Sequence, residues 1–144
     1  MTKGKKMTIW IRIIIGVLAV LVSYVCFAQD NGKAAYIEAY SDNVKSSLPA
    51  IAKGFEVNGA PPEQALQEAE AFVEKAINCH ATHFDEYPEA LKTALFEAIA
   101  SGGSYPDAER TIENFVLDAQ IAGDEASFSQ FMTATENGLS CLRG

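Results

Sequence analysis

Signatures of catalysis and metal binding are scarce in this 144-residue chain. It has two histidines, three cysteines and one tryptophan. It has no Cys-x-x-Cys, His-Glu-x-x-His or Gly-x-Ser-x-Gly motif, no phosphate loop and no dinucleotide fingerprint. These absences argue against a zinc protease, a serine hydrolase and a nucleotide-dependent enzyme. We therefore expect a protein that is not an enzyme and uses no cofactor.

Sustained period-two alternation is also missing, which argues against a β-sheet. Apolar residues instead recur every three or four positions, as in Leu66, Ala69, Val73 and Ile77. The segments 58–62, 101–106 and 122–124 are rich in helix-breaking residues and separate these stripes, while Pro49 predicts a kink or a break within 34–57. The pattern predicts an all-α fold, a small antiparallel bundle of five or six helices.

The first 28 residues have the layout of a secretory signal peptide. Four basic residues, ending at Arg12, precede or border an apolar run over 13–25, and small residues lead to a cleavage site between Ala28 and Gln29. An uncleaved anchor is the alternative, although the run is shorter than the roughly 20 residues of a spanning helix. We expect residues 29–144 to form a single exported domain, periplasmic or secreted, that meets the membrane only if the signal is retained.

The chain has an excess of acidic residues. Its net charge is −8, and the signal segment holds four of the 11 basic residues but none of the 19 acidic ones, so residues 29–144 carry −12. This charge argues against nucleic acid and anionic membranes as partners and favours a cationic protein partner. Solubility of an exported protein is the simpler explanation.

Cysteine parity predicts a disulfide. Cys26 would leave with the signal, so the exported chain would keep Cys79 and Cys141. An even pair in an oxidising compartment most simply forms a disulfide. We expect a Cys79–Cys141 bond that ties the C-terminus to the core and removes Cys79 as a nucleophile or a metal ligand.

The segment "INCHATHFDEYP" (77–88) holds both histidines and is the main candidate for a site. His80 and His83 would share one side of a helix and could ligate a metal or a small molecule, or His80 could simply continue an apolar stripe. Phe84 and Tyr87 follow in a predicted loop beside the disulfide. With His83 they are candidate partner-binding residues, the alternative being burial under a neighbouring helix.

A short internal repeat pairs "YPEALKT" (87–93) with "YPDAERT" (105–111). Proline followed by an acidic residue is typical of the first turn of a helix. Ser104 and Asp107 add the pattern of a capping box. The repeat thus predicts two helix starts, and a duplicated ligand-binding element is the less favoured interpretation.

Together these features predict an exported, acidic, helical binding protein. We expect an inhibitor-like or immunity-like protein that acts on a cationic protein partner. A periplasmic stress protein or chaperone is one alternative. A metal or small-ligand carrier that uses His80 and His83 is the other.

Overall fold

The computed structural model describes residues 31–144, and every regular element within them is helical. Residues 31–46 form the first described helix, ahead of the labelled elements. The labelled elements are α2 (Leu48–Val57), α3 (Pro62–His83), the short 3₁₀ helix η1 (Phe84–Glu86), α4 (Glu89–Ala100), α5 (Tyr105–Ala122) and α6 (Glu125–Arg143). The all-α prediction is confirmed. The predicted signal segment and its cleavage site lie outside the described residues.

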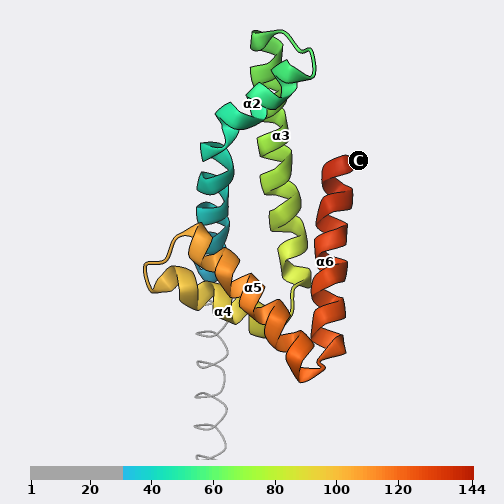
Figure 1. Ribbon diagram of the computed structural model, residues 1–144. Helices are drawn as coiled ribbons and strands as arrows, with labels where there is room; N and C mark the ends of the chain where they lie inside the picture. Colours follow the sequence, from blue (N-terminus) through green and yellow to red (C-terminus); the bar gives the residue numbers. More distant parts are fainter. Residues whose placement is uncertain (1–30) are drawn as a thin grey trace, which may run out of the picture.

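The helices do not form a simple up-and-down bundle. The segment 31–57, α3 and α6 run side by side with alternating direction, and α4 and α5 cross them at the end far from the α2–α3 turn (Figure 1). Within the part of the chain that the structure describes, no helix is long and apolar enough to span a membrane.

Local sequence explains where the helices begin and end. Ser47 forms the turn between the first described helix and α2, and Pro49 lies in the first turn of α2, so the predicted break is confirmed. Ser104 and Asp107 make the predicted capping box of α5. Gly123 ends α5 with a left-handed φ of 67°, a conformation that costs glycine little because it lacks a Cβ.

The main core lies at the end where α4 and α5 cross the other helices. Tyr36, Phe84, Leu91 and Leu95 are its largest fully buried side chains, and Ala108 and Ala134 complete it from α5 and α6. Along α2 and α3, by contrast, the buried residues are mostly alanines. Large aromatic side chains therefore fill the core at one end of the molecule, whereas α2 and α3 pack against each other through small side chains.

Candidate functional site

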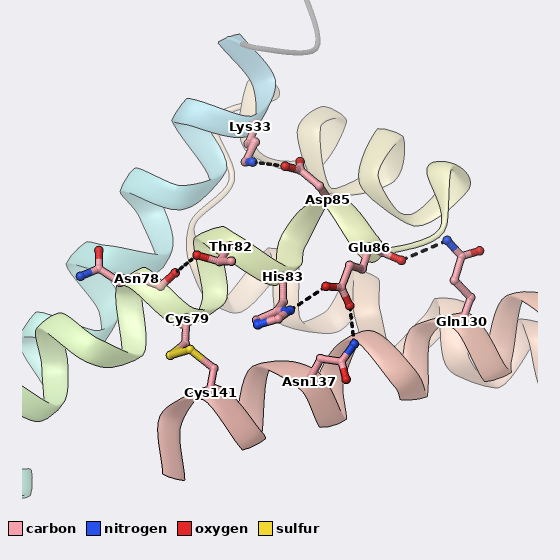
Figure 2. A network of polar contacts seen from close by, with 10 residues as sticks. All are labelled: Lys33, Asn78, Cys79, Thr82, His83, Asp85, Glu86, Gln130, Asn137 and Cys141. Carbon is pink, nitrogen blue, oxygen red and sulfur yellow. Dashed lines mark hydrogen bonds and ion pairs between the residues drawn. A yellow bond between two sulfur atoms is a disulfide. The ribbon is translucent and has the colours of Figure 1, made fainter. Parts of the chain in front are cut away.

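The disulfide predicted from the sequence is present. Cys79 on α3 and Cys141 on α6 are joined, with their Cα atoms 5.7 Å apart (Figure 2). Cys79 is therefore not available as a thiolate for nucleophilic attack or for metal ligation. Such a bond is compatible with an oxidising, exported compartment.

His80 faces the aromatic core. Its Nε2 atom lies 3.1 Å from the Tyr36 hydroxyl, and its ring stacks on Tyr40 with a centroid distance of 3.9 Å. Burial lowers the pKa of His80 from 6.5 to about 4, because a charged imidazole would lose its hydration there. At neutral pH His80 is thus an uncharged, half-buried and hydrogen-bonded residue beside the core, which is the simpler of its two predicted roles.

This burial predicts a loss of stability in mild acid. The folded-state pKa of His80 is below the unfolded value, so between about pH 6.5 and 4 the unfolded chain binds the extra proton and is favoured. We expect the free energy of unfolding to fall by about 2 kcal/mol from pH 7 to pH 5 through this group. Urea unfolding at the two pH values measures the change. His80→Gln should remove most of this difference between pH 7 and pH 5, and His83→Gln should retain it. An equal loss of unfolding free energy in wild type and His80→Gln would contradict the assignment to His80.

His83 has different surroundings, close to the surface between α3 and α6. Its Nδ1 atom lies 2.7 Å from one carboxylate oxygen of Glu86, and the other oxygen accepts a 2.7 Å hydrogen bond from the Asn137 amide (Figure 2). The Gln130 amide donates to the Glu86 backbone carbonyl. The hydrogen bonds from Asn137 and then His83 lower the pKa of Glu86. Glu86 therefore links α3 to two positions of α6, and His83 is one member of this link.

The two histidines do not share a bonding partner. Their bonded ring nitrogens have separate partners, Tyr36 for His80 and Glu86 for His83. Among residues 31–144, no group of three or more histidine, cysteine, aspartate or glutamate side chains is arranged to hold a metal ion. In this part of the chain, nothing supplies the further ligands that a carrier using His80 and His83 would need.

Phe84 and Tyr87, two of the candidate partner-binding residues, do not present their rings at the surface. Phe84 is 1% exposed and Tyr87 7%. η1 turns both rings inward, where Phe84 packs on Tyr36 and Tyr87 packs on Phe131. The alternative of burial beneath neighbouring helices describes them correctly.

Sequence reasoning missed an aromatic cluster built from four tyrosines and His80. Tyr36 and Tyr40 come from the first described helix, and Tyr87 and Tyr105 come from the two copies of the repeat. The Tyr40 ring lies 5.3 Å from Tyr105, and burial is the main cause of the raised pKa values of all four phenols. The shared Tyr-Pro motif was the available signal. It marks helix starts whose tyrosines enter one core.

An uncovered length of α3 is the most prominent surface feature. The disulfide fixes the register of α3 and α6, and α6 ends shortly after Cys141, whereas α3 begins at Pro62. At about 1.5 Å per residue, roughly 20 Å of α3 extends past the end of α6. Figure 1 shows that α3 continues beyond the C-terminal end of α6. We call α2 together with residues 62–75 of α3 the arm.

The arm combines acidic and apolar side chains. Leu66 is 45% exposed and Phe72 38%, although the sequence pattern placed Leu66 on the inner stripe. The acidic residues of α3 in the arm are Glu63, Glu68, Glu70 and Glu74. The ion pairs of the described residues join Lys33 to Asp85, Lys53 to Glu56, Lys92 to Glu89, Arg110 to Asp107 and His83 to Glu86, so none of them neutralises these four.

Comparisons with known proteins returned no match. No family model, no curated protein and no solved structure is similar to this chain.

Proposed function

We propose that this protein is an exported binding module that captures a cationic protein partner through the arm, in the manner of an inhibitor or an immunity protein. The observation that carries the proposal is the exposure of Leu66 and Phe72 among four acidic side chains on a length of α3 that α6 does not cover. The basic, apolar N-terminal segment and the Cys79–Cys141 bond support export to the periplasm or beyond.

The two kinds of side chain would contribute to different steps of binding. The acidic groups would attract a basic partner over distances of about a Debye length and raise the rate of encounter. Leu66 and Phe72 would act after encounter, because apolar anchors that lose contact with water slow dissociation. The arm replaces Phe84 and Tyr87 as the proposed contact, since those two residues are buried.

The test is capture from a periplasmic extract of the source cells, followed by kinetics with the partner so identified. We expect one basic protein in stoichiometric amount, bound by wild type and lost by Leu66→Ser with Phe72→Ser. The control, Leu117→Ser with Ile121→Ser, changes two apolar residues outside the arm that are more exposed than Leu66 and Phe72, and it should retain the partner. A mixture of unrelated clients would favour the chaperone alternative, and a partner retained by the arm variant would overturn the proposal.

Charge variants test the electrostatic part. Replacing the four glutamates of the arm by glutamine should lower the association rate about tenfold at low salt and flatten its salt dependence. The control alters four acidic residues elsewhere: Glu109→Gln, Glu113→Gln, Asp118→Asn and Glu125→Gln. If both variants slow association equally, the overall charge rather than the arm attracts the partner.

A further inference from the structure

A cavity of about 130 Å³, partly open to solvent, lies between α3 and α6 beside the disulfide. It is distinct from the arm. Its walls include Tyr40, His80, Tyr87, Thr135 and Gly138. An engineered cavity of about 150 Å³ in another protein binds benzene, so a cavity of similar size can hold one small aromatic ring.

The side chains that face each other across the cavity from α3 and α6 are small. Ala76 on α3 and Ala134 and Gly138 on α6 line the gap. The disulfide joins α3 to α6 beside the cavity, and Tyr87, which follows η1, packs on Phe131 of α6 with the ring centroids 5.5 Å apart. These small side chains leave the space between the two links unfilled.

Gly138 has no packing reason to be glycine. It lies inside α6, where glycine is less favourable than alanine, and its φ is not positive. A Cβ built on Gly138 would meet no atom within 4 Å. Alanine would therefore fit and would strengthen the helix. What the glycine does achieve is to keep the cavity open.

The walls favour an uncharged aromatic ligand. The Tyr40 and His80 rings stack on each other, and Tyr87 lies edge-on to His80 at an interplanar angle of 80°. His80 is uncharged at neutral pH, and His83, which also lines the cavity, is already bonded to the Glu86 carboxylate, so neither histidine offers a free positive charge to an anionic ligand. The hydroxyl of Thr135, which donates to the Phe131 carbonyl, adds a polar group to a mostly aromatic and aliphatic lining.

We propose that this cavity is a binding site for a small, uncharged aromatic molecule bearing one hydroxyl or N–H group, of the phenol or indole class. The ring would occupy the space beside Gly138, against Tyr40 and Tyr87. Because no feature of the arm enters the argument, the site stands or falls independently of the proposed protein partner.

The test is an NMR titration of the exported, oxidised protein with phenol and with indole. We expect saturable shifts of the backbone amides of residues 76–80 and 134–139, with dissociation constants of about 0.1–1 mM, as befits ligands of so few atoms. Cyclohexanol, similar in size but not aromatic, should bind more weakly. Tetramethylammonium tests the rival possibility of an aromatic cage for cations. Absence of saturable shifts, or tighter binding of tetramethylammonium than of phenol, would overturn the proposal.

Two glycine variants make the test specific. Gly138→Leu should fill the cavity and weaken phenol binding at least about tenfold, and Gly138→Ala should weaken it less while raising the melting temperature. Gly54→Leu is the matched control, because Gly54 is also helical and faces open space but does not line this cavity. Unchanged phenol binding by folded Gly138→Leu would exclude the cavity as the site.

Discussion

The Cys141→Ser variant should have a free energy of unfolding about 2–5 kcal/mol lower than that of the oxidised wild-type protein. The Cys79–Cys141 bond closes a loop with a sequence separation of 62 residues, and closure of so long a loop removes about 4 kcal/mol of unfolded-state entropy in the chain-entropy model. The loss is large for a small domain whose total stability is about 5–15 kcal/mol. Urea denaturation of the variant against wild type measures it.

Reduction provides the control for this variant. Wild-type protein in excess dithiothreitol should show the same loss of stability as the Cys79→Ser, Cys141→Ser double variant, because both lack the bond. Agreement between them would show that the loss comes from the missing bond and not from the introduced serines. Two titratable thiols in the exported protein, or a stability of Cys141→Ser within about 0.5 kcal/mol of wild type, would contradict the role assigned to the bond.

Phe84→Ala should be similarly damaging, with a loss of about 3–5 kcal/mol. Phe84 is 1% exposed, and its ring packs against Tyr36, Tyr87 and Phe96 at centroid distances of 4.8, 5.4 and 5.8 Å. Truncation would leave a cavity at the point where the first described helix, η1 and α4 meet. Thermal and urea unfolding report the change.

Phe72→Ala is the matched comparison, because Phe72 is 38% exposed and lies in the arm. Its cost should be well under half that of Phe84→Ala, since much of its ring already contacts water. In partner binding the order should be reversed: Phe72→Ala should weaken binding more than folded Phe84→Ala, because Phe72 and not Phe84 supplies the proposed contact. Equal stability losses would mean that the arm is more tightly packed than its exposure indicates.

Local features of the chain were readable from the sequence because their causes are local. A proline beyond the first turn interrupts a helix, so Pro49 required a new helix to begin just before it. Ser104 and Asp107 cap a helix through atoms only three residues apart. The helical period of the apolar residues was equally informative, and it predicted the all-α class. The disulfide was predicted from the number of cysteines that remain when the predicted signal segment is set aside.

Exposure was harder to predict than helicity. Leu66 continues an apolar stripe and was expected to face inward, yet nothing in residues 31–144 covers it completely, and it is 45% exposed. Phe84 and Tyr87 follow a helix end, and the sequence left both partner contact and burial open for them; η1 turns them into the core. In each case the outcome depends on where a distant helix lies, and periodicity carries no information about that distance.

The sequence by itself therefore determined the secondary structure, the helix boundaries, the charge and the cysteine pair. Only the tertiary structure decided that α6 stops part-way along α3, that four tyrosines meet around His80, and that Gly138 faces a cavity. The physical reason is that helix formation and capping depend on neighbours three or four residues away. The uncovered arm and the cavity, by contrast, depend on the register between α3 and α6. This register is fixed by contacts between residues 44 to 62 positions apart in sequence.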